Sequence, residues 1–151
     1  MSEIATFRRF LEDHPASFIV TMAEIRGSTP REEGAVMAVS ANRTCGTIGG
    51  GQLEYIAIDH ARRLLKGHDA PLRLDIALGP EIGQCCGGRA VLAFEITDDG
   101  TVERLLTSLA EKAASYPSVY IFGGGHVGAA LAAALAPLPF KTSVIETRPD
   151  M

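Results

Sequence analysis

The chain has 151 residues, of which 46% are hydrophobic, and this suffices for a packed core in one domain or in one domain and part of another. Its net charge of −4 argues against general nucleic-acid binding, and no apolar run approaches the roughly 20 residues of a membrane span. Because the N-terminus lacks a signal-peptide pattern and the three cysteines form no disulfide framework, we expect a cytoplasmic protein.

The first 116 residues alternate between helical and strand patterns. Apolar residues recur at helical spacing between residues 4 and 11 and predict an amphipathic helix that ends near Pro15. Strands are predicted over residues 17–25, 35–39, 44–48, 72–78 and 89–97, helices over 52–65 and 101–116, and turns at 42–43 and 98–100. These elements indicate an α+β domain with mostly antiparallel strands over residues 1–116.

Three glycines, Gly49, Gly50 and Gly51, lead directly into the helix predicted over residues 52–65. A glycine-rich helix start presents bare N–H groups and the positive end of the helix dipole, which together suit an anion. A plain turn is the alternative interpretation. Glu54 lies in the first turn, where a carboxylate favours the dipole or could hold a hydrogen-bond donor of a ligand.

Two adjacent thiols, Cys85 and Cys86, lie between Gln84 and a pair of glycines, so a ligand could approach both the sulfurs and the main chain. Adjacent cysteines rarely bridge each other, and the spacing of a zinc site is absent. Two interpretations remain. The thiols are small buried hydrophobes, or they bind something soft such as sulfur or a soft metal centre.

The pattern changes at Pro117, which we predict as a domain boundary. A strand over residues 119–122, a helix over 127–136 and a strand over 142–145 follow. Gly123, Gly125 and Gly128 open the helix and Glu146 ends the second strand, which is the context of a dinucleotide-binding fingerprint. The glycines would admit a pyrophosphate, and Glu146 would accept hydrogen bonds from ribose hydroxyls. His126 would face the ligand or be structural. Residues 117–151 thus predict the first β-α-β unit of a Rossmann-like domain in an α/β protein.

Four motifs in this order and spacing, GSTPREEGAVMAV, CGTIGGGQLE, GQCCGG and YIFGGGHVG, resemble the XdhC/CoxI family of xanthine dehydrogenase accessory proteins. The resemblance implies a chaperone that binds molybdenum cofactor (molybdopterin), keeps it during sulfuration and hands it to xanthine dehydrogenase. It places Cys85 and Cys86 in the family's cysteine motif, as molybdenum or sulfur contacts, and residues 49–54 in its glycine-rich motif. Gln84 is expected to join them, and Arg31 or Arg89 to hold the phosphate. A cysteine desulfurase is expected as a further partner.

Family members normally continue through a complete Rossmann-like domain, so we expect this chain to end inside that domain. NAD(P) should then bind only weakly, and residues 118–151 should need a partner surface, which favours a homodimer. Two other functions stay open. One is an NAD(P)-dependent oxidoreductase fragment that uses Cys86 or His126, and the other is a docking module without a cofactor.

Overall fold

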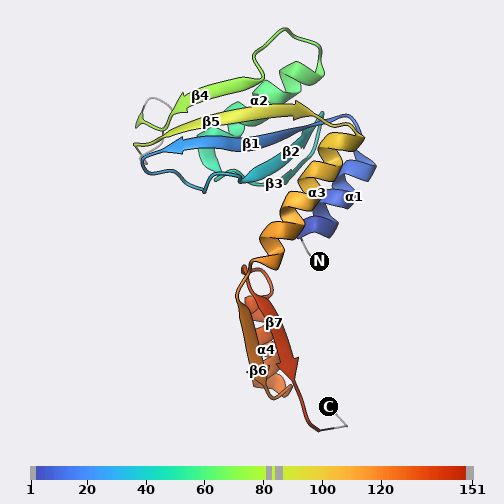
Figure 1. The fold of residues 1–151 in the computed structure, drawn as a ribbon. Coiled ribbons are helices and arrows are strands. Elements are labelled where there is room, and N and C mark those ends of the chain that lie inside the picture. Colours follow the sequence, from blue (N-terminus) through green and yellow to red (C-terminus); the bar gives the residue numbers. More distant parts are fainter. Residues whose placement is uncertain (1–2, 81–82, 84–86, 149–151) are drawn as a thin grey trace. The chain divides into compact units, whose positions relative to one another are not determined.

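The computed structural model describes residues 3–80, 83 and 87–148, and its elements follow the predicted order (Figure 1). The helices are α1 (Glu3–Asp13), α2 (Gly51–Leu65), α3 (Asp99–Ala114) and α4 (His126–Leu135). The strands are β1 (Ser17–Arg26), β2 (Val36–Ser40), β3 (Thr44–Gly46), β4 (Arg73–Ala77), β5 (Arg89–Ile96), β6 (Ser118–Phe122) and β7 (Lys141–Ile145). The predicted α/β class is confirmed. Within the described residues, no helix is both long and apolar enough to cross a bilayer.

Five strands form one antiparallel sheet in the order β3-β2-β1-β5-β4. Its core face packs against α2, which buries Leu53, Ala57 and Ala61 among the sheet residues Val20 and Leu92. Burying apolar side chains of this size is the main favourable contribution to folding. The antiparallel arrangement expected for the first part of the chain is thus confirmed.

His60 lies on the buried face of α2. Its Nε2 lies 2.7 Å from the carbonyl oxygen of Pro71, and its ring lies 4.7 Å from that of Phe94. A buried polar group with a hydrogen-bond partner is satisfied. We therefore assign His60 a structural role in the core.

A β-bulge interrupts the pairing of β1 with β5. Met22 pairs with Leu92 and Glu24 pairs with Val91, so Ala23 is the extra residue. Side chains alternate between the two faces of a regular strand, so residues two apart share a face. The extra residue of a bulge shifts this alternation by one position. As a result Met22 is buried, whereas Glu24 stands on the opposite, open face.

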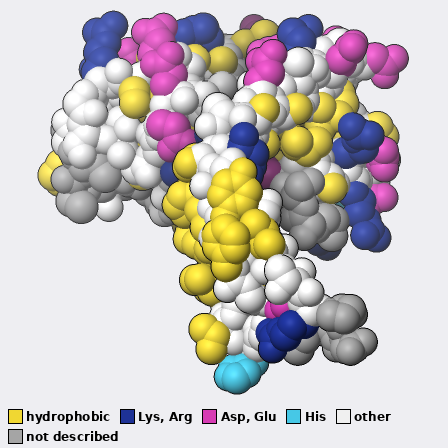
Figure 2. Space-filling view, turned by 60° about the horizontal axis from the view of Figure 1, so that its bottom comes forward, with side chains coloured by type: hydrophobic (Ala, Val, Ile, Leu, Met, Phe, Trp, Pro, Cys, Tyr) yellow, Lys and Arg dark blue, Asp and Glu magenta, His cyan; other side chains and the backbone are white. Residues whose placement is uncertain are grey.

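The chain divides into two compact units, Met1–Leu106 and Thr107–Met151, and the division falls within α3. In the second unit β6 and β7 pair in parallel and α4 connects them, as the β-α-β prediction requires. The boundary expected at Pro117 stays a prediction. Apolar side chains gather on the surface of this unit (Figure 2), including Tyr120, Phe122 and Val127, which are 60%, 79% and 71% exposed.

Two local predictions were wrong. The turn expected at residues 98–100 is instead the start of α3, because Asp98 caps the helix: its Oδ1 accepts a hydrogen bond of 2.7 Å from the N–H of Thr101. The same bond holds the pKa of Asp98 below its usual value. The strand expected to reach residue 48 ends at Gly46, whose φ of 77° leaves the extended conformation.

Candidate functional site

Three loops of the first unit that carry the sequence motifs meet at one end of the five-stranded sheet. A Cβ atom placed on Gly49, before α2, would lie 2.5 Å from Cγ of Pro30 in the loop between β1 and β2. A Cβ atom on Gly88, before β5, would lie 2.0 Å from the carbonyl oxygen of Ser28 in that same loop. Only glycine permits contacts this close. The β1–β2 loop therefore lies against both the triple glycine and the end of the cysteine motif.

Glu54 organises the turn that precedes α2. Its Oε1 accepts hydrogen bonds of 3.0 Å from the N–H groups of both Ile48 and Gly50, and another from the hydroxyl of Thr47. The Thr47 hydroxyl also accepts from the N–H of Gly49, at 3.1 Å. Two of the N–H groups predicted to bind an anion are thus engaged by side chains of the chain itself.

The first helical turn of α2 still offers donors to a ligand. Gly51 and Gln52 open the helix, and N–H groups at these positions have no acceptor within an α-helix. The positive end of the helix dipole lies at the same place. Of the three predicted glycines, Gly51 therefore remains as a candidate donor and the N–H of Gln52 is a further one, and anion binding there remains a prediction.

Glycines in two of these loops face open space. A Cβ atom on Gly50, Gly83 or Gly87 would meet no atom of the described residues within 4 Å, and their φ angles are 79°, 66° and 69°. Positive φ at these values explains why glycine stands there, because other residues would be strained. The main chain is thus bare at these positions, and a ligand could lie directly against it.

Arg31 is the cation that borders the triple glycine. Its Cγ would lie 3.6 Å from a Cβ atom on Gly49, and its side chain is 35% exposed. Its guanidinium forms an ion pair of 3.4 Å with Glu32. Arg31 therefore lies close to the start of α2, as a residue that would hold a phosphate there should.

The predicted sulfur site falls on Gln84, Cys85 and Cys86, which lie outside the described residues, so their roles remain predictions. Cys45, in β3, is buried, and burial raises the pKa of its thiol. A raised pKa keeps the thiol protonated and unreactive. Among the described residues, no group of three His, Cys, Asp or Glu side chains could hold a metal ion.

In the second unit, the glycine fingerprint forms the tight turn that its spacing predicts. A Cβ atom on Gly128 would lie 1.9 Å from the carbonyl oxygen of Gly123, so only glycine allows α4 to pack this close to the loop. Gly123 has a φ of 106° and Gly125 caps α4. His126 is the exposed first residue of the helix, and it lines an open groove of about 510 Å³ along β6 and α4.

Glu146 is held at the end of β7 by the chain itself. Its Oε2 accepts from the N–H of Gly124 at 2.7 Å and from Nη2 of Arg148 at 2.9 Å. Its Oε1 accepts from the backbone and Nε of Arg148, at 2.8 and 3.1 Å. The Arg148 side chain first, and then these N–H groups, lower the pKa of Glu146 to about 2. A ribose hydroxyl would have to compete with these donors.

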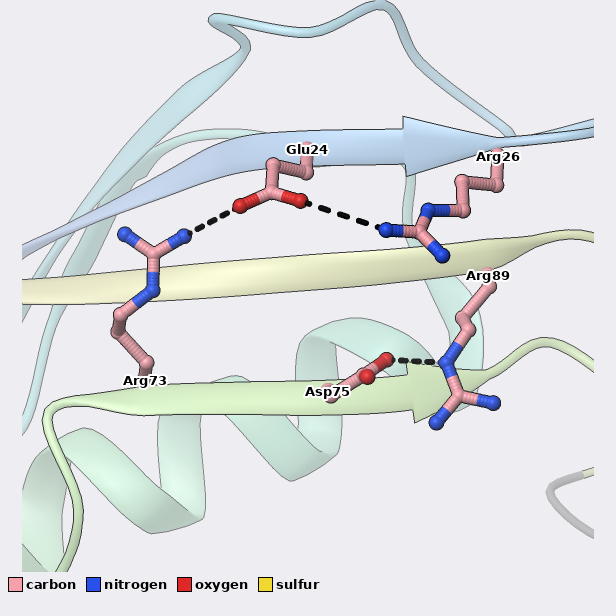
Figure 3. Close-up of polar contacts among 5 residues, drawn as sticks. All are labelled: Glu24, Arg26, Arg73, Asp75 and Arg89. Carbon is pink, nitrogen blue, oxygen red and sulfur yellow. Dashed lines mark hydrogen bonds and ion pairs between the residues drawn. The ribbon is translucent and has the colours of Figure 1, made fainter.

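Sequence reasoning missed a charged cluster on the open face of the sheet (Figure 3). Arg89 had been considered only by its position in the motif. The cluster, which we call the arginine cluster, consists of Glu24, Arg26, Arg73, Asp75 and Arg89. Arg73 and Asp75 alternate with apolar residues along β4, and this pattern indicates that they share a face. The same pattern does not place Glu24 and Arg26, because the bulge at Ala23 shifts the alternation in β1.

Part of the chain matches a known protein family. Residues 11–75, which contain the first two motifs and the turn before α2, match the XdhC and CoxI family. The resemblance to this family is confirmed. None of the curated proteins matches the chain.

A solved structure supports the fold over almost the whole chain. It is the crystal structure of a xanthine dehydrogenase from Bacillus halodurans, with a TM-score of 0.78 and 18% sequence identity. The match covers 99% of this chain and 64% of the other. At this identity the likeness establishes a shared fold, and the chain spans less than two thirds of the solved protein.

Proposed function

We propose that this protein binds molybdenum cofactor, supports its sulfuration and delivers it to xanthine dehydrogenase. The observation that carries the proposal is the meeting of the β1–β2 loop, the turn before α2 and the end of the cysteine motif. These segments carry the motifs of the XdhC and CoxI family, two of them within the matched residues. A site assembled from three loops on a rigid sheet is typical of ligand binding.

The described residues fit the phosphate and the pterin end of this cofactor. The N–H groups of Gly51 and Gln52 suit a phosphate, and Arg31 lies beside Gly49 of the same turn. The bare main chain at Gly50 and Gly87 leaves room for a flat ring system. Cys85 and Cys86 would supply thiolates, which are the ligand type that a soft, sulfur-rich molybdenum centre prefers.

Partners and location complete the proposal. Xanthine dehydrogenase would receive the cofactor, a cysteine desulfurase would supply the sulfur, and the protein would act in the cytoplasm as a homodimer. It would bind and transfer a cofactor rather than turn over a substrate. The family match over residues 11–75 supports xanthine dehydrogenase as the recipient.

Cofactor retention tests the proposal. The protein should be purified from a host that makes molybdenum cofactor, with molybdenum measured by mass spectrometry and the pterin by fluorescence. We expect both to co-purify and to be lost in Cys85→Ser or Cys86→Ser, but not in Cys45→Ala, which removes the buried thiol of β3. A wild-type protein that carries neither molybdenum nor pterin would contradict the proposal, and would favour a docking module.

An NAD(P)-dependent oxidoreductase is a second candidate, favoured by the close packing of Gly128 against Gly123. Because Glu146 already binds Gly124 and Arg148, we expect NAD(P) affinity weaker than about 1 mM, a binding free energy under about 4 kcal/mol. Calorimetric titration with NADH and NADPH measures this affinity. Submillimolar binding without molybdenum would favour the oxidoreductase.

A further inference from the structure

The arginine cluster lies on the face of the five-stranded sheet opposite α2. The strand register explains its position, because Glu24 and Asp75 both pair with Val91, whereas Arg26 pairs with Arg89. Side chains of paired residues point to the same face of a sheet. Figure 3 shows all the members on that face, where they line a hollow of about 300 Å³.

Positive charge exceeds negative charge within the cluster, which has three guanidiniums and two carboxylates. Arg73 binds Glu24 at 2.8 Å, and Nε of Arg89 binds Asp75 at 2.5 Å. Among the described residues, the one carboxylate with which Arg26 forms an ion pair is that of Glu24, at 4.0 Å, which Arg73 already binds, and the Arg26 side chain is 79% exposed. Arg26 therefore has no carboxylate of its own within the cluster, and most of its N–H groups are open to a ligand.

Arg26 and Arg89 stand directly opposite each other across β1 and β5. Like charges at opposed positions destabilise a sheet, and an anion bound between them would remove that cost. Gly27 directly follows β1 and Gly88 directly precedes β5. A Cβ atom on Gly27 would lie 3.4 Å from Cα of Gly88. The opposed arginines thus lie at the end of the sheet where the loops of the candidate site begin.

We propose that Arg26 and Arg89 form a binding site for a phosphate-type oxyanion on this open face. Guanidinium groups present planar, paired N–H donors that match phosphate oxygens, and every cation of the cluster is an arginine. Exposed ion pairs such as those with Glu24 and Asp75 contribute little, so a doubly charged phosphate can displace them. Arg89 is also one of the two arginines expected to hold the cofactor's phosphate, but this site is defined by the open face of the sheet and does not depend on the proposed cofactor function.

Binding can be measured on the full chain by two-dimensional ¹⁵N NMR, with ionic strength held constant by sodium chloride. The probes are inorganic phosphate and adenosine 5′-monophosphate. We expect saturable shifts of the backbone amides at Arg26 and Arg89, with a Kd of about 1 mM or tighter. Arg26→Gln and Arg89→Gln should each weaken binding by about tenfold or more, because each removes a charge-assisted pair of hydrogen bonds.

Arg104→Gln provides the matched control. Arg104 lies in α3, pairs with Glu95 at 2.9 Å and is as exposed as the cluster residues, but it lies outside the hollow. Its replacement should change the Kd by less than about twofold. Binding of both probes would assign the site to phosphate esters, and binding of phosphate alone to the free ion. Shifts that stay unsaturated at about 20 mM with both probes, or equal losses in all three variants, would overturn the proposal.

Discussion

Glu54 shows how one carboxylate can shape the turn that precedes a helix. A single oxygen receives the N–H groups of Ile48 and Gly50 and the hydroxyl of Thr47. Sequence reasoning assigned Glu54 to the helix dipole or to a ligand, and both are reasonable for an acid in a first helical turn. The bonds to residues that precede the helix could not be predicted, because they depend on the path of the turn.

Replacement of Glu54 should therefore loosen the turn. Glu54→Ala leaves three donors without their acceptor, and we expect it to lower the free energy of unfolding by about 1–3 kcal/mol. Glu54→Gln keeps an acceptor oxygen, so its effect should be smaller. Urea unfolding followed by circular dichroism measures both. Equal losses in the two variants would show that charge, rather than the acceptor, holds the turn.

The pKa of Glu146 provides a second test at the scale of residues. Because this pKa is lowered from 4.5 to about 2, the contacts to Gly124 and Arg148 stabilise the loop above pH 4.5, and their contribution is lost as pH falls toward 2. We expect the carboxyl carbon of Glu146 to titrate near pH 2 by NMR. In Arg148→Gln its midpoint should rise, because the largest cause of the shift is removed. A wild-type midpoint near 4.5 would contradict the assigned contacts.

At the scale of elements, the sequence indicates most helices and strands because their local patterns are strong. The alternation of Leu74 and Ile76 with charged residues marks β4, and Gly67 and Pro71 mark the end of the preceding helix region. The start of α3 was predicted wrongly, because Asp98 and Gly100 are typical of turns and the capping bond to Thr101 outweighs that tendency. Strand order could not be predicted, because it depends on contacts between distant segments.

Gly88, directly before β5, is the position between elements where we expect a substitution to be most disruptive. Gly88→Ala would drive a methyl group to 2.0 Å from the carbonyl of Ser28, so the β1–β2 loop and the end of the cysteine motif would have to separate. We expect a loss of about 3 kcal/mol of stability together with loss of cofactor retention.

Gly87→Ala is the control for this substitution. Its methyl group would meet no atom of the described residues within 4 Å, and the cost of the substitution arises from a φ of 69°, about 1–2 kcal/mol. The comparison is made from melting temperatures of the two variants. If Gly88→Ala proves no more disruptive than Gly87→Ala, the close contact between the two loops does not exist in solution.

At the scale of the whole molecule, the second unit leaves apolar surface exposed. Phe122 and Tyr120 of β6 are 79% and 60% exposed, and parallel strands normally have both faces covered. The sequence predicts this, because a β-α-β unit has too few elements to cover its own sheet. The surface that covers it is not determined by the sequence, and we expect a second copy of the chain.

Sedimentation velocity on the full chain tests this expectation. The wild type should form a dimer, and Phe122→Lys should shift it toward the monomer because a charge is costly in an apolar contact. Leu72→Lys, which changes an apolar residue of the first unit that is 55% exposed, should leave the dimer intact. A wild-type protein that stays monomeric at all concentrations would contradict a homodimer.

The bulge in β1 has a consequence for the comparison of related sequences. Met22 and Glu24 pair with the consecutive residues Leu92 and Val91, so removal of Ala23 would leave a regular strand with every side chain on its present face. A relative can therefore lack this residue and keep both the core and the arginine cluster. An alignment of such relatives should open a one-residue gap in the middle of β1. An alignment without that gap would assign Glu24 and Arg26 to the wrong face of the sheet.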